Sequence, residues 1–193
     1  MPRFVWTHGA LHVSIAAFVL LVAGVLMAVS SSSAWGEVSG NGARIDVYLS
    51  EGRIVAPGFG SFGLEWSSEQ FDDADGIGLV RVGSILALVG TISVFVSMAV
   101  VGFAVALRHI HFATLGSILA AVSFMVALAG LILFPIGAEQ VWDWFRDEGD
   151  GGQASQQEDI DWGAGLVLGV IATTFALGGT IAGFTALRHP DVT

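Results

Sequence analysis

The sequence predicts an all-α membrane protein, a four-helix transmembrane bundle with a small extracellular antiparallel β-layer. The 193-residue chain is 54% hydrophobic and only 12% charged, which is not the balance of a soluble globular domain. Four segments have the length needed to cross a hydrocarbon core, about 20 apolar residues, and none contains Asp, Glu, Lys or Arg. The loop between the first two segments shows the alternation of β-strands.

We expect the four helices over residues 9–29, 82–107, 112–137 and 163–187, so that residues 1–193 form a single tetraspan domain. The first apolar stretch is longer than the roughly 7–15 residues of a signal-peptide core, and we interpret it as a helix that stays in the membrane. Cleavage after the small residues of "LMAVSSSSA" is the alternative.

Small residues in the fourth segment indicate close helix packing. Lipid is as apolar as leucine, so helices associate in membranes where small side chains let their backbones approach. Gly165 with Gly169, and Gly179 with Gly183, form two pairs spaced for this purpose. We expect both pairs to lie at helix contacts.

Arginine positions predict the orientation. Arg3, Arg108 and Arg188 flank the membrane segments on one face, and cationic residues in short flanks are retained in the cytoplasm. Both termini are therefore expected to be cytoplasmic, and loops 30–81 and 138–162 extracellular, in a multi-pass protein of the cell membrane.

The first outer loop should hold most of the β-layer. Alternating apolar residues in "ARIDVYLSEGRIVAP" predict a hairpin with "EG" at its turn and a return strand over residues 53–56. A third strand should place Phe62, Leu64 and Trp66 on one face, and "AWGEV" is a candidate fourth strand. We expect Trp66 to be buried, and a short helix capped by Ser67 or Ser68 to follow it.

In the second outer loop, "AEQVWDWFRDE" predicts that the third helix continues past the bilayer, with Trp142 and Trp144 at or above the interface. Asp161 is a candidate N-cap for the fourth helix.

Charge is concentrated in these loops. They carry all the acidic residues except Asp191, in a chain with 17 Asp and Glu and a net charge of −10. Lysine is absent, and such an acidic surface is typical of halophilic proteins, in which concentrated salt screens the repulsion. There is no cysteine, so the outer layer must be ordered by packing and not by disulfides.

Several residues together resemble the claudin and peripheral-myelin-protein tetraspan superfamily. They are Trp35 soon after the first span, Gly63, Leu64 and Trp66 in "GLEW", Arg81 before the second span, and the third-span extension through Trp142. The family's cysteine pair after the tryptophan is missing, and Glu65 is an addition inside the motif. The resemblance implies a tetraspan with an outer β-layer that acts in adhesion.

Motifs for other chemistry are weak. His8, His12, His109, His111 and His189 lie on the predicted cytoplasmic face and are best interpreted as interfacial polar residues, with metal binding as the alternative. "DDADG" and "DEGDGG" lack the ligand spacing of an EF-hand loop. No charge lies inside the spans for a proton relay, and the negative charge argues against nucleic acid.

We therefore expect a non-enzymatic scaffold or adhesion protein with no cofactor and no metal, whose partners are membrane lipids and either copies of itself or other membrane proteins. Two alternatives remain open: an accessory subunit that stabilises a larger membrane complex, and an oligomeric pore selective for cations.

Overall fold

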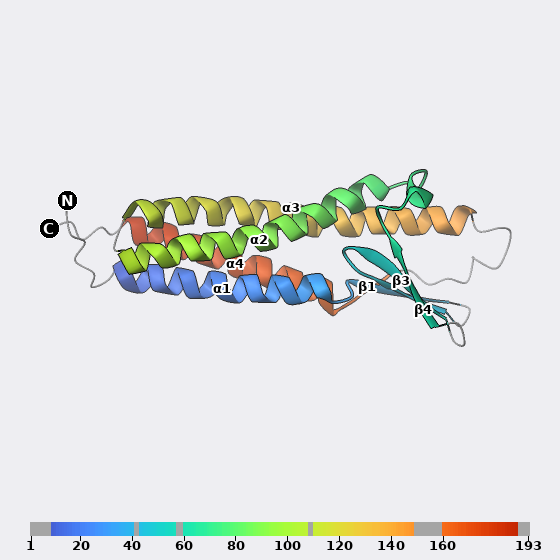
Figure 1. Cartoon of the computed structure of the whole chain (residues 1–193), viewed down its shortest axis with the longest axis horizontal. Coiled ribbons are helices and arrows are strands. Elements are labelled where there is room, and N and C mark those ends of the chain that lie inside the picture. Colours follow the sequence, from blue (N-terminus) through green and yellow to red (C-terminus); the bar gives the residue numbers. More distant parts are fainter. Residues whose placement is uncertain (1–8, 41–42, 57–59, 108–109, 149–159, 189–193) are drawn as a thin grey trace. The chain divides into compact units, whose positions relative to one another are not determined.

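The computed structural model describes residues 9–40, 43–56, 60–107, 110–148 and 160–188. Four long helices account for most of them: α1 (Gly9–Ser32), α2 (Ile77–Leu107), α3 (Ile110–Glu148) and α4 (Ala164–Arg188) (Figure 1). All four are long and apolar enough to cross a membrane, as a multi-pass membrane protein requires.

Helices α2 and α3 are longer than a count of uncharged residues predicts, whereas α4 has the predicted length of 25 residues. α2 begins at Ile77, directly after Gly76, whose φ of +80° suits glycine. The helix then runs through Arg81, where the prediction had placed its start, because the buried side chains of Ile77 and Val80 already belong to its packed face. α3 likewise continues to Glu148, as the aromatic extension indicated.

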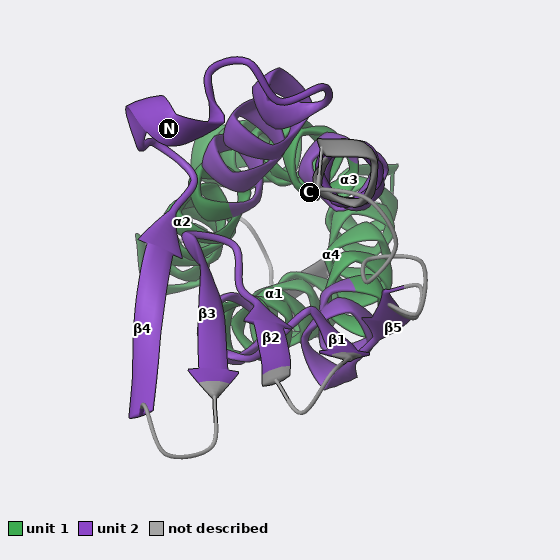
Figure 2. Ribbon diagram, turned by 90° about the vertical axis from the view of Figure 1, so that its right-hand side faces the viewer, with its two compact units in different colours: residues 1–28, 88–128, 170–193 green, residues 29–87, 129–169 purple. Residues whose placement is uncertain are grey.

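The chain divides into two compact units, and each helix contributes one stretch to each of them (Figure 2). Unit 1 comprises residues 1–28, 88–128 and 170–193, and unit 2 comprises residues 29–87 and 129–169. The core of unit 1 draws on all four helices and is dominated by small side chains, among them Ala16, Ala23, Ala104, Ala120, Ala172 and Ala176. Ser97 and Ser123 lie within this core with their hydroxyls 3.1 Å apart.

Unit 2 contains a five-stranded antiparallel sheet in the order β4-β3-β2-β1-β5. Its strands are β1 (Gly36–Gly40), β2 (Ala43–Val47), β3 (Glu51–Ala56), β4 (Gly60–Glu65) and β5 (Asp161–Trp162). β5 comes from the second loop and pairs with Gly36 and Glu37. Asp161 is therefore a strand residue, and the prediction that it caps the fourth helix was wrong.

The predicted "EG" turn was also wrong. β2 ends at Val47, and the Tyr48 N–H donates to the Glu51 carbonyl across 2.9 Å, so the turn lies at residues 48–50. Gly52 pairs with Val47 inside the sheet. It has another reason to be glycine, because a Cβ there would lie 3.0 Å from the indole of Trp66.

After β4 the chain makes only the 3-10 turn η1 (Glu69–Phe71) where a capped helix was predicted. Ser68 precedes it, but its side chain makes no capping hydrogen bond. Phe71 is fully buried instead, so packing and not capping holds this segment.

Candidate interaction surface

The sheet of unit 2 has two chemically different faces. Alternation puts Val38, Val47, Ile54 and Leu64 on one face and Glu37, Asp46, Arg53 and Glu65 on the other. The first face joins the buried cluster of unit 2, and the second carries the charges.

Trp35 anchors the start of the sheet. Its indole is buried, donates from Nε1 to the Ser30 carbonyl across 2.9 Å, and meets the ring of Phe134 edge-on with 5.2 Å between centroids. Its backbone N–H donates to Val47 across 2.7 Å. A tryptophan that is packed and has its N–H paired contributes both area and a fixed orientation.

Trp66, directly after β4, anchors the other side of the sheet. It is 8% exposed, covers Gly52, and lies 5.5 Å from the ring of Phe71. Its Nε1 donates to the Tyr48 carbonyl across 2.9 Å. The burial agrees with the expectation from alternation, because Leu64 packs partly against the same cluster.

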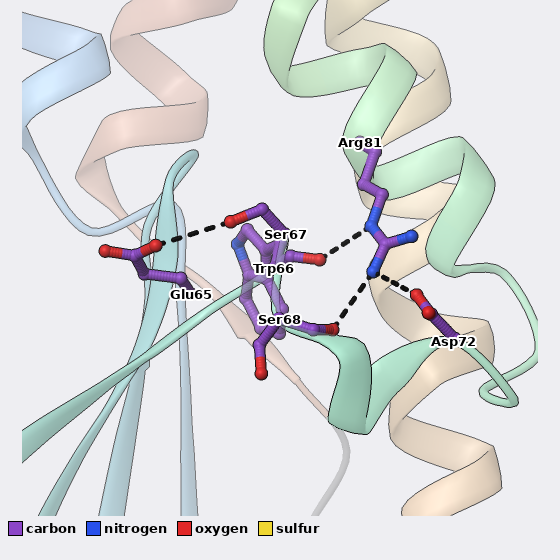
Figure 3. A network of polar contacts seen from close by, with 6 residues as sticks. All are labelled: Glu65, Trp66, Ser67, Ser68, Asp72 and Arg81. Carbon is purple, nitrogen blue, oxygen red and sulfur yellow. Dashed lines mark hydrogen bonds and ion pairs between the residues drawn. The ribbon is translucent and has the colours of Figure 1, made fainter.

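Arg81 joins α2 to the segment after β4 (Figure 3). Its Nε donates to the Trp66 carbonyl across 2.7 Å, while one terminal nitrogen donates to the Ser68 carbonyl at 3.1 Å and pairs with Asp72 at 2.7 Å. The planar guanidinium donates from two separate nitrogens in a fixed geometry, whereas lysine would have to reach the same acceptors from a single nitrogen. Arg81 was singled out from sequence, but these acceptors were not.

Ser84 provides an anchor that sequence reasoning missed. Its buried hydroxyl contacts the carbonyl of Leu49, at the 48–50 turn, and that of Val80. Leu49 is itself buried. A lone serine in an apolar helix gives no signal of a partner thirty-five positions away.

The remaining predicted residues lie in different surroundings. Trp142 is buried and Trp144 is half-buried, both on α3.

The four packing glycines of α4 lie where a side chain would meet a neighbouring segment. A Cβ on Gly165 would lie 2.6 Å from the Ala34 carbonyl oxygen, and one on Gly169 would lie 3.1 Å from Ser30 Oγ. A Cβ on Gly179 would lie 2.8 Å from Leu20, and one on Gly183 would lie 2.5 Å from Ser117 Oγ. Each of these glycines thus sits at a close approach between segments of its own unit.

The polar face is crossed by ion pairs. Arg44 pairs with Glu37 at 3.1 Å and with Asp46 at 2.6 Å, and Arg53 pairs with Glu51 at 2.6 Å. The hydrogen bond that Arg44 donates to Asp46 raises the pKa of Arg44, and the one that Arg53 donates to Glu51 raises the pKa of Arg53. These exposed pairs add little stability, but they fix an alternating pattern of charge.

Gly63 lies on this polar face opposite Arg53, beneath the carboxylate of Glu51. Any side chain at Gly63 would displace that carboxylate. The other face of β4 carries Phe62, which is 51% exposed, so the apolar face is not fully covered at this edge.

No metal site forms among the residues that the structure describes, since no three His, Asp or Glu side chains there gather to hold an ion. Of the histidines named above, His8, His109 and His189 lie outside the described residues. Asp72 of the "DDADG" segment is paired with Arg81, and most of "DEGDGG" lies outside the described residues.

Known proteins give no further identification: no protein-family model matches the chain, and no curated protein matches it.

Proposed function

We propose that this chain is a non-enzymatic membrane scaffold that presents the sheet of unit 2 on the outer surface and associates through it. The observation that carries this proposal is the asymmetry of the sheet. Four contacts, from Trp35, Trp66, Arg81 and Ser84, fix its apolar side. A charged face and the strand edge at β4 are left for partners.

The number of contacts that keep the sheet of unit 2 ordered supports a binding role. The sheet has no disulfide to hold it, since the chain has no cysteine, and a small sheet is stable only where something covers its apolar face. The buried Trp35 and Trp66, together with Arg81 and its three hydrogen-bond acceptors, hold the sheet in place. A loop that only connected two helices would not require them.

The resemblance to the claudin superfamily points the same way. Trp35, Trp66 and Arg81, three of the residues that carry it, all take part in anchoring the sheet. We infer a claudin-like scaffold, with both termini cytoplasmic and the sheet extracellular, on the arginine flanks described above. Adhesion to a neighbouring cell or envelope is the corresponding role.

Co-purification tests the proposal. Two full-length versions with different tags, expressed together and extracted from native membranes in gentle detergent at high salt, should purify as one complex. If each tag retrieves only its own version and the particles are monomers, self-association is excluded.

An accessory subunit is the second candidate. Among the described residues, none has an atom within 4 Å of the place a Cβ would occupy on Gly102 of α2, and only Val19, at 3.9 Å, comes near that place on Gly178 of α4. Such positions let a helix of another protein approach closely. Recovery of one stoichiometric foreign membrane protein in the same purification would favour this candidate, and cation flux in reconstituted liposomes would favour the pore.

A further inference from the structure

β4 is an edge strand that lacks the usual protection. It is the last strand in the order β4-β3-β2-β1-β5, and no described strand pairs with its other side (Figure 2). Natural edges are blunted by lysine, proline or bulges. The chain has no lysine, β4 has no proline, and its register with β3 runs without a bulge from Glu65 to Gly60.

Two hydrogen bonds show which backbone groups face the open side. The Trp66 N–H donates to Ser50, so alternation in an antiparallel ladder gives Leu64 and Phe62 the bonds to β3 and turns Ser61, Gly63 and Glu65 outward. The bond from Tyr48 to Glu51 on the other side of β3 gives the same alternation. The N–H and C=O groups of Ser61, Gly63 and Glu65 therefore lie along the open edge.

Side chains add an apolar stripe that ends at this edge. Val38, Ile45, Ile54 and Phe62 stand opposite one another across the four neighbouring strands. Val38 is 2% exposed, Ile45 and Ile54 are half-buried, and Phe62 is 51% exposed. A strand added beside β4 would continue the stripe and cover Phe62.

We propose that the added strand is β4 of a second copy, paired antiparallel about a two-fold axis through Gly63. Each Ser61 then stands opposite a Glu65 of the other copy, and each Phe62 opposite a Leu64. Backbone bonds form at Gly63 and at both Ser61–Glu65 pairs, where the groups already point outward. The proposal rests on the proposed function and specifies the surface through which it acts.

Complementarity selects this partner and this register. A two-fold through Glu65 would set two carboxylates opposite each other, which is unfavourable, and one through Ser61 would set Phe62 opposite Gly60. Among two-fold axes that pass through an outward-facing residue of β4, only the one through Gly63 places Phe62 opposite Leu64, and it sets no two charged residues of β4 directly opposite each other. The interface is isologous and closes as a dimer.

Single cysteines test the register cleanly, because the chain has none of its own. In full-length protein in native membranes, Gly63→Cys should form a disulfide dimer on mild oxidation, since paired Cα atoms about 5.5 Å apart suit a disulfide. Ser61→Cys alone should not, because four residues of offset place the two thiols about 14 Å apart. When the Ser61→Cys and Glu65→Cys variants are expressed together, a disulfide should link one copy of each into a heterodimer. Ser39→Cys, an exposed serine of β1, is the matched control.

A second pair of variants distinguishes loss of the β4–β4 contact from a general loss of sheet stability. Phe62→Ser should lower the Gly63→Cys dimer yield several-fold, whereas Val55→Ser, at an exposed position on the interior strand β3, should leave it unchanged.

The proposal is overturned if Gly63→Cys crosslinks no better than Ser39→Cys, if Ser61→Cys dimerises by itself, or if the β4 cysteines crosslink only to other proteins. Co-purification of the two tagged versions without β4 crosslinks would reject this interface and leave the proposed self-association standing. Failure of both would reject both.

Discussion

Removal of the Trp66 indole should disorder the sheet while the four helices stay inserted. Trp66 is 8% exposed and contacts Gly52 and Phe71, and replacing a buried tryptophan with alanine costs about 3–5 kcal/mol. Trp66→Phe keeps much of the apolar contact and loses only the donor to the Tyr48 carbonyl, at a cost of about 1–2 kcal/mol. The helices keep their internal hydrogen bonds in either variant.

Hydrogen exchange measures this effect. Every 1.4 kcal/mol lost is about a tenfold change in the opening equilibrium, so amides of β3 and β4 in Trp66→Ala should exchange two to four orders of magnitude faster, up to the limit of free exchange. Trp66→Phe should be intermediate. Phe62→Ala, at an exposed position of β4, is the control and should change little when the protein is monomeric. Exchange in Trp66→Ala as slow as in the parent would refute the anchoring role of this side chain.

Three further changes have defined outcomes. Arg81→Lys replaces two donor nitrogens by one, and should lower the stability of the segment from Trp66 to Asp72 by about 1–2 kcal/mol. Faster proteolysis of that segment would show the loss, and unchanged proteolysis would contradict it. Gly83→Ala would put a Cβ 2.6 Å from the Phe134 backbone and should reduce thermal stability, whereas Gly102→Ala on the same helix would meet no described atom within 4 Å and should not. Equal melting of the two variants would argue against a close α2–α3 contact. Transfer from molar to dilute salt lengthens the screening distance from about 3 Å to about 10 Å and should loosen the acidic loops before the helices, which protease sensitivity at the two salt concentrations would test.

Local patterns predicted the elements of unit 2 better than their ends. Alternation predicted strands over residues 44–50, 53–56 and 62–66, because each has an apolar face that must be covered. It could not find β5, which is only Asp161–Trp162. Two residues are too few to show an alternating pattern. They form a strand because the backbones of Gly36 and Glu37, far away in sequence, pair with them.

Glycine and arginine were misinterpreted for a related reason. Gly52 looked like a turn residue, but it is required by the indole above it. Arg81 looked like the boundary of a span, but its charge is satisfied by carbonyls and by Asp72, so the helix passes through it. In both cases the deciding contact comes from a segment that a local window does not include. The partner of Ser84 was hidden in the same way.

The pairing of β5 with β1 makes the two loops between helices a single folding element. The Gly163 N–H donates to the Trp35 carbonyl across 2.7 Å, and that of Gly165 to Ala34 across 2.9 Å. A chimera that receives residues 30–81 from this chain but keeps its own second loop would leave those carbonyls without donors and the outer side of β1 bare. Transplanting the sheet into another tetraspan host should therefore succeed only when residues 160–165 travel with it.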